Sequence, residues 1–168
     1  IDLFDSLFDP ARQGKQRATD IEMQILTALD AVESLDEDRI LRRYLNAVLS
    51  TLRTNFFQPD ENGAVKSYLS LKFDSALLDE LPLPRPETEI FVHSPRVDAV
   101  HLRGGAVARG GIRWSDRRED FRTEILGLMK SQMTKNAVIV PVGAKGGFIV
   151  KHPPVDGGRD ALMEEGIA

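Results

Sequence analysis

The sequence has no cysteine, no long apolar run and no signal-like segment at its start. Without cysteine the chain cannot form a disulfide or a thiolate metal site, which fits a cytoplasmic location. No stretch approaches the roughly 20 apolar residues of a membrane-spanning helix, so we expect no membrane partner. The three histidines, His93, His101 and His152, lack metal-ligand spacing and are interpreted as structural. We therefore expect a globular protein without a metal.

The length allows one compact domain, or a helical segment joined to one. The chain has 168 residues, opens with Ile1, and stops at Ala168 inside a pattern that looks like a continuing helix. We therefore expect a piece of a larger protein.

The net charge of −4 conceals a strong asymmetry along the chain. Residues 1–95 hold 10 Lys and Arg against 17 Asp and Glu, whereas residues 96–151 hold 11 against 5. Residues 152–168 are acidic again, with 1 against 4. A basic segment inside an acidic chain suits binding of a small anion or of nucleic acid.

Residues 1–58 are predicted to form a helical segment. We expect an irregular lead-in over residues 1–18, because Pro and Gly interrupt its apolar pattern. Beyond it, apolar residues recur at steps of three and four, the period of an amphipathic helix. Ser34 and Glu37 have the spacing of a capping box at the start of a second helix. This helical pair is predicted to end near Asn55.

Residues 59–168 are predicted to form the α/β part. Period-two alternation and β-branched residues predict strands over residues 69–73, 90–93 and 97–103. Three prolines predict a rigid connector over residues 81–86. The pair Gly104-Gly105 predicts a hairpin that leads into residues 106–109.

The next predicted elements are a helix and a short buried strand. Asp116 with Glu119 offers a helix start, and the apolar stripe that follows predicts one helix over about 117–135. Residues 137–142 are apolar and β-branched, which favours a buried strand. We expect this strand to end in a glycine-rich loop over residues 143–147.

Two segments carry candidate chemistry. In the first, Gly110 and Gly111 stand between Arg109 and Arg113, so a backbone could approach a ligand beside two guanidinium groups. Guanidinium binds carboxylate bidentately, which makes the segment a candidate carboxylate clamp. A tight turn with solvated arginines is the alternative interpretation.

The second segment surrounds Lys145, which follows the predicted buried strand among small residues. A lysine at a strand end lies where α/β folds place ligand sites, and desolvation adapts a lysine to acid–base chemistry. A structural loop is the alternative, whereas a phosphate-binding loop would need Ser or Thr where Gly146 stands. Lys135, at the end of the predicted helix, has a structural interpretation through the helix dipole.

Three motifs occur in order between Pro95 and Lys151. They are Arg-Gly-Gly-Ile-Arg-Trp-Ser-Asp from Arg109, Met-Thr-Lys-Asn-Ala-Val from Met133, and Pro-Val-Gly-Ala-Lys-Gly-Gly from Pro141. Together they resemble the amino-acid dehydrogenases of the glutamate dehydrogenase superfamily. Arg-Arg-Glu-Asp-Phe-Arg over residues 117–122 is closer still to its large-subunit bacterial branch, which is NAD-specific.

The resemblance implies a role for each matching residue. Lys145 matches the catalytic lysine, and Lys135 matches the lysine that holds the substrate α-carboxylate. Arg109 stands where smaller enzymes have a lysine that binds the side-chain carboxylate, and Gly110 and Gly111 line the approach. Arg in place of Lys keeps the charge but changes reach and geometry.

The resemblance also implies a fold, a cofactor and a reaction. The fold is part of a substrate-binding domain with a mixed sheet and helices, and the full-length enzyme is a homo-oligomer. It converts L-glutamate to 2-oxoglutarate and ammonia with NAD, which binds to parts that are missing here. The dinucleotide fingerprint of glycines opening a helix after a strand is absent from this chain, so the piece alone is expected to be inactive.

Three other interpretations remain open. Leucine, valine and phenylalanine dehydrogenases share the lysines, but a cation at Arg109 favours a substrate with a second carboxylate. An anion- or nucleic-acid-binding module is less favoured, because few aromatic residues are available for base stacking and we expect no nucleic-acid partner. Residues 1–58 could also serve in regulation or assembly.

Overall fold

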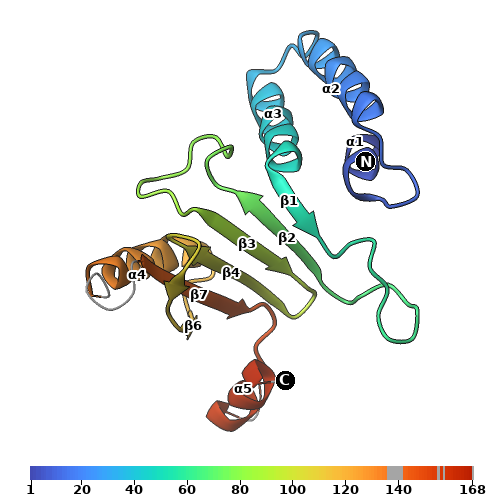
Figure 1. The fold of residues 1–168 in the computed structure, drawn as a ribbon. Coiled ribbons are helices and arrows are strands. Elements are labelled where there is room, and N and C mark those ends of the chain that lie inside the picture. The colour runs from blue at the N-terminus through green and yellow to red at the C-terminus, as the bar shows by residue number, and fades with distance from the viewer. Residues whose placement is uncertain (136–141, 155, 157, 168) are drawn as a thin grey trace.

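The computed structural model describes residues 1–135, 142–154, 156 and 158–167. Helices at the N-terminal end lead into a mixed sheet, and one long helix packs on a face of that sheet (Figure 1). The fold is therefore α/β, as the sequence predicts. The helices are α1 (Asp2–Phe8), α2 (Lys15–Leu29), α3 (Leu35–Leu49), α4 (Phe121–Lys135) and α5 (Gly158–Ile167). The strands are β1 (Thr51–Thr54), β2 (Leu69–Asp74), β3 (Thr88–His93), β4 (Val97–Arg103), β5 (Ala108–Arg109), β6 (Ile112–Trp114) and β7 (Val142–Val150).

The start of the chain is more regular than predicted. The expectation of an irregular lead-in over residues 1–18 is wrong, because α1 and the first residues of α2 lie there. The reason is tertiary contact: the ring of Phe4 contacts those of Phe8, Phe56 and Phe57. Packing against residues far along the chain stabilises a helix that is too short to be stable alone.

The predicted start of the second helix at Ser34 is confirmed, whereas its predicted end near Asn55 is wrong. The Ser34 hydroxyl accepts a hydrogen bond from the Glu37 N–H at 3.4 Å and caps α3. α3 ends at Leu49, and the chain does not stay helical to Asn55. It enters β1, which pairs with β2, so the sheet begins before residue 59. Pairing with a distant strand overrides the local helical pattern here.

The sheet has the order β1-β2-β3-β4-β7-β5, with β6 also paired to β7. β1 to β4 and β7 are antiparallel neighbours, whereas β5 and β6 run parallel to β7 along its other edge. The strands predicted over residues 69–73, 90–93 and 97–103 are confirmed. The proline connector is also confirmed, since no helix or strand lies between β2 and β3.

The hairpin predicted at Gly104-Gly105 is wrong. The strand that follows pairs with β7 in parallel and not with β4. Gly104 N–H donates a hydrogen bond to the Gly143 carbonyl at 2.9 Å, and a Cβ on Gly105 would lie 2.7 Å from Val142 Cγ2. These glycines allow close passage of the chain beside β7, which is a different use of glycine from a two-residue turn.

The glycine-rich loop predicted over residues 143–147 is also wrong, because these residues lie within β7. A Cβ on Gly143 would lie 2.6 Å from Gln132 Cβ, and a Cβ on Gly147 would collide with Ile125. The glycines thus let α4 pack directly on the strand. Val142 begins β7, while the rest of the strand predicted over 137–142 lies outside the described residues.

α4 covers one face of the sheet and makes the core with β4. It begins at Phe121 and not near residue 117, because a turn precedes it. The core consists of Val100 and Leu102 from β4 with Ile125, Leu126 and Met129 from α4. Among the described residues, no helix is long and apolar enough to span a bilayer.

Candidate functional site

The edge of the sheet formed by β5, β6 and β7 brings together the predicted site residues other than Lys135. β5 and β6 keep the same offset against β7, with the pairs Ala108–Val142, Arg109–Gly143, Ile112–Gly146, Arg113–Gly147 and Trp114–Phe148. The offset therefore places the intervening Gly110 and Gly111 opposite Ala144 and Lys145. Gly146 N–H donates to the Gly111 carbonyl at 2.9 Å, which holds this segment against the strand.

Lys145 lies on the face of the sheet that α4 covers. Its register partner in β4 is Leu102, which is fully buried in the core beneath α4, and paired residues of a ladder share a face. The Lys145 side chain is half-buried, and its Nζ lies 3.8 Å from the position of a Cβ on Gly111. The missing side chain at Gly111 thus leaves room beside the Lys145 amino group.

Arg109 belongs to the same face. Arg109 pairs with Gly143, and Gly143 lies two residues before Lys145 on β7, so Arg109 lies on the side of the sheet that carries Lys145. Arg109 is exposed. Arg109, Gly111 and Lys145 therefore lie along one edge of the sheet.

The end of α4 lies over the same region. Gln132 Cβ and Met133 N come within 3 Å of a Cβ built on Gly143, two residues from Lys145. Lys135 is the last residue of α4, but its side chain lies outside the described part of the chain. Nothing in the sequence indicated that Gln132 lies against the strand that carries Lys145.

A second group joins β6 to α4. The sequence offered its Arg113 as the second guanidinium group of the candidate clamp, but it gave no sign of the contact with Glu124. Arg113 Nε donates to Glu124 Oε1 at 2.5 Å, and the Ser115 hydroxyl donates to Glu124 Oε2 at 2.5 Å. The Ser115 hydrogen bond, and then the Arg113 hydrogen bond, lower the pKa of Glu124. The sequence signal was weak, since Glu124 looks like an ordinary acidic residue in the first turn of a helix.

His101 lies on the opposite face of the sheet. It lines a cavity of about 600 Å³ together with residues such as Ile112 and Phe148. Burial lowers the pKa of His101, and the nearby charge of Arg103 lowers it further. Among the described residues, no cluster of three or more acidic, His or Cys side chains could hold a metal ion. The prediction of a structural histidine agrees with this position.

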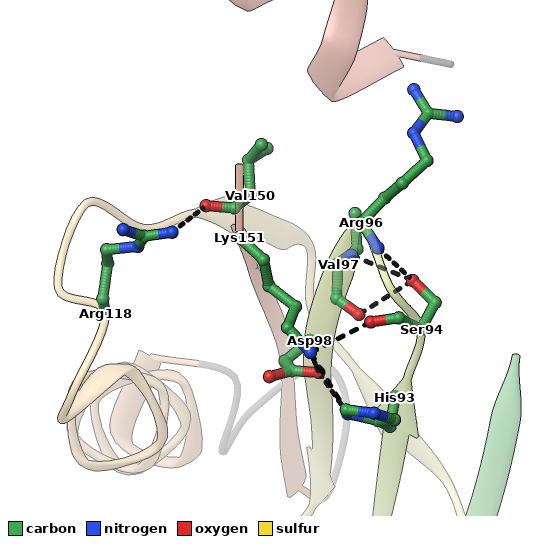
Figure 2. Close-up of polar contacts among 8 residues, drawn as sticks. All are labelled: His93, Ser94, Arg96, Val97, Asp98, Arg118, Val150 and Lys151. Atoms are coloured by element: carbon green, nitrogen blue, oxygen red, sulfur yellow. Dashed lines mark hydrogen bonds and ion pairs between the residues drawn. The ribbon is translucent and has the colours of Figure 1, made fainter. Parts of the chain in front are cut away.

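Cations at the far end of β7 bind protein groups (Figure 2). Lys151 Nζ donates to the Ser94 carbonyl at 3.1 Å and lies 3.4 Å from Asp98 Oδ1. Arg118 Nη2 donates to the Val150 carbonyl at 3.3 Å. Lys151 therefore stabilises the turn between β3 and β4, and Arg118 stabilises the end of β7.

The glycines near Lys145 do not fit a dinucleotide. Pyrophosphate binding uses glycines at a strand-to-helix turn, where the helix N-terminus meets the phosphates. Gly143, Gly146 and Gly147 instead lie inside β7. These three glycines of β7 therefore do not form a nucleotide-binding turn.

Comparison with known proteins identifies close relatives. Residues 24–168 match the family described as bacterial NAD-glutamate dehydrogenase, catalytic domain. NAD-specific glutamate dehydrogenase of Pseudomonas aeruginosa is 64% identical over 148 residues, 88% of this chain. The proteins of the same name from Halomonas elongata and Mycobacterium tuberculosis are 56% and 55% identical and cover the whole chain. The chain spans only 9–11% of the length of these relatives.

Proposed function

The chain belongs to the bacterial NAD-glutamate dehydrogenase family, and from this we propose that it forms part of the glutamate-binding region of an NAD-dependent glutamate dehydrogenase. It matches the catalytic-domain family over most of its length, yet covers about a tenth of each relative. The complete activity therefore belongs to the full-length protein that contains this chain.

One observation carries the proposal. Lys145 Nζ lies 3.8 Å from the position that a Cβ on Gly111 would take, and Arg109 lies on the same face of this sheet edge. A dicarboxylic amino acid fits this arrangement, because its side-chain carboxylate can bind Arg109 while its α-carbon approaches Lys145. Lys135, at the end of α4, would hold the α-carboxylate.

In the proposed reaction, L-glutamate, NAD⁺ and water give 2-oxoglutarate, ammonium, NADH and a proton. NAD, bound by parts of the protein outside this chain, is the oxidant. Lys145 acts after oxidation: its amino group takes a proton from the water that attacks the imine carbon of 2-iminoglutarate. The resulting ammonium group stabilises the carbinolamine and returns the proton to the departing nitrogen.

The surroundings of Lys145 support this acid–base role. The side chain is half-buried, with Leu102 on one side and the glycine segment on the other. Partial exclusion of water strengthens electrostatic interactions with a bound carboxylate. Gly111 gives the substrate an approach that a larger side chain would obstruct, whereas Gly110 packs against the Ala144 backbone.

The experiment that tests the function is an assay of the full-length protein with 2-oxoglutarate, ammonium and NADH. We expect turnover with NADH in preference to NADPH, and much weaker turnover with 4-methyl-2-oxopentanoate, the 2-oxo acid of leucine. Turnover only with the apolar 2-oxo acid would assign the chain to a branched-chain enzyme. We also propose that the full-length protein is a homo-oligomer, which sedimentation velocity can test.

A further inference from the structure

The segment beside Lys145 has no side chains of its own to fix its position. Gly110 and Gly111 lie between the last residue of β5 and the first residue of β6. β5 has two residues and β6 has three, so the ladder with β7 is short on both sides. Glycine is the most flexible residue, so the position of this segment depends on the Gly146 N–H bond to the Gly111 carbonyl and on contacts of the residues that flank it.

Glu124 supplies such contacts from α4. Its two carboxylate oxygens each accept one hydrogen bond, at 2.5 Å from Arg113 Nε in β6 and at 2.5 Å from the hydroxyl of Ser115, the residue directly after β6. The Glu124 side chain is 14% exposed, and Ser115 is 2% exposed. A shielded carboxylate with two donors gives a defined geometry, unlike an ion pair on the open surface.

The register connects this anchor to the site. Arg113 pairs with Gly147 and lies on the face that carries Lys145, two residues after Gly111. The anchor therefore holds the strand immediately after the segment that faces the Lys145 amino group. It acts on β6, whereas Lys145 is held in β7 by its pairing with β4.

We propose that Glu124 is a positioning residue for substrate binding: by holding Arg113 and Ser115 it fixes Gly111, and with it Arg109, relative to Lys145. The proposal rests on the proposed function, because it assigns Arg109 and Gly111 to the substrate site. It predicts a specific kinetic pattern, since loss of the anchor displaces the side that binds the substrate but leaves Lys145 in its strand.

The test compares Glu124→Gln with the wild-type full-length protein. Gln keeps the shape of the side chain but removes the charge, so we expect the KM for 2-oxoglutarate to rise about tenfold while kcat changes less than about threefold. Ser115→Ala, which removes one of the two bonds, should raise KM in the same direction and gives the test if Glu124→Gln does not fold. Because the two residues share a bond, the double variant should resemble Glu124→Gln.

Asp38→Asn is the control. Asp38 on α3 also accepts a hydrogen bond from an arginine, Arg42 Nε, at 2.8 Å, but α3 leads into β1, at the opposite edge of the sheet from β6. Its KM should equal that of the wild type. An unchanged KM in both Glu124→Gln and Ser115→Ala, or a fall in kcat at unchanged KM, would overturn the proposal. Wild-type protein that does not turn over 2-oxoglutarate would instead refute the proposed function, and the positioning role with it.

Discussion

Gly110 lies so close to the backbone carbonyl of Ala144 that any Cβ at this position would collide with it. Its neighbour Gly111 is different, because a Cβ there would meet only Lys145 Nζ among the residues that the structure describes, at 3.8 Å. The first glycine is therefore required for the strands to approach each other. The second keeps room beside the proposed catalytic amino group.

Alanine substitutions at these glycines should separate folding from activity. Gly110→Ala should destabilise the β5–β7 edge by about 3 kcal/mol or more, because the clash is with backbone that cannot move aside. Gly111→Ala should change local stability by less than about 1 kcal/mol but lower kcat/KM about tenfold, since a methyl group occupies the substrate approach. Hydrogen exchange in β7 and steady-state kinetics measure the two effects. Equal effects of both substitutions would contradict this account.

Arg109 should determine the preference for a dicarboxylic substrate. Arg109→Leu removes the guanidinium group and leaves the side-chain carboxylate of the bound substrate without a counterion. We therefore expect kcat/KM for 2-oxoglutarate to fall about a hundredfold. Activity with 4-methyl-2-oxopentanoate should stay constant or rise. Arg85→Leu is a control at a second exposed arginine, and it should leave both values unchanged. A parallel fall for both substrates in Arg109→Leu would argue against a carboxylate contact.

The ion pair of Glu89 and Arg122 should hold α4 on the sheet. Arg122 Nε and Nη2 donate to the two carboxylate oxygens at 2.7 and 2.6 Å, and Glu89 is buried. Arg122→Met leaves this carboxylate buried without a partner, which costs about 3 kcal/mol and should accelerate hydrogen exchange in α4 about a hundredfold.

Two comparisons make the ion-pair prediction specific. Arg117→Met breaks an exposed pair with Asp120 and should cost less than about 1 kcal/mol. The double variant Glu89→Leu/Arg122→Met should exchange more slowly than Arg122→Met, because no charge remains buried. Exchange in α4 that is unaffected by Arg122→Met would refute the role of the pair.

The lowered pKa of His101 predicts a loss of stability on acidification. The folded state binds a proton at His101 less readily than the unfolded state does. The contribution of neutral His101 to the free energy of unfolding is therefore complete above the ordinary histidine pKa of about 6.5. It is lost as the pH falls below that value toward the folded pKa. His101→Gln should therefore weaken the pH dependence of β4 hydrogen exchange between about pH 7 and 5, after correction for the chemical rate. His152→Gln, at an exposed position, should leave the pH dependence of β4 hydrogen exchange unchanged.

The sequence predicted elements whose signals are local. The alternation over residues 97–103 matches β4, and the Ser34 cap marks the start of α3. The glycines misled the prediction, because their local signal is a turn or loop while their role in the structure is close packing. Gly147 makes room for Ile125 of α4, a contact that no local pattern contains.

The sequence named the candidate site residues, but it did not predict the strand pairing that brings them together. Lys145, Arg109 and Gly111 were candidates from their residue pattern and from motif resemblance, and the structure adds their shared edge. The parallel pairing that unites them joins residues about 34 positions apart, for which single-sequence reasoning has no signal. The same holds for Glu124, whose partners lie on another element.

The central claim is that Lys145 carries out acid–base catalysis, and the most direct test is Lys145→Ala in the full-length protein. The assay follows NADH oxidation with 2-oxoglutarate and ammonium, with Lys130→Ala as a control at an exposed lysine of α4. We predict that Lys145→Ala folds normally and loses at least about a thousandfold in kcat, whereas the control retains full activity. A Lys145→Ala variant with kcat within about tenfold of the wild type would contradict the account.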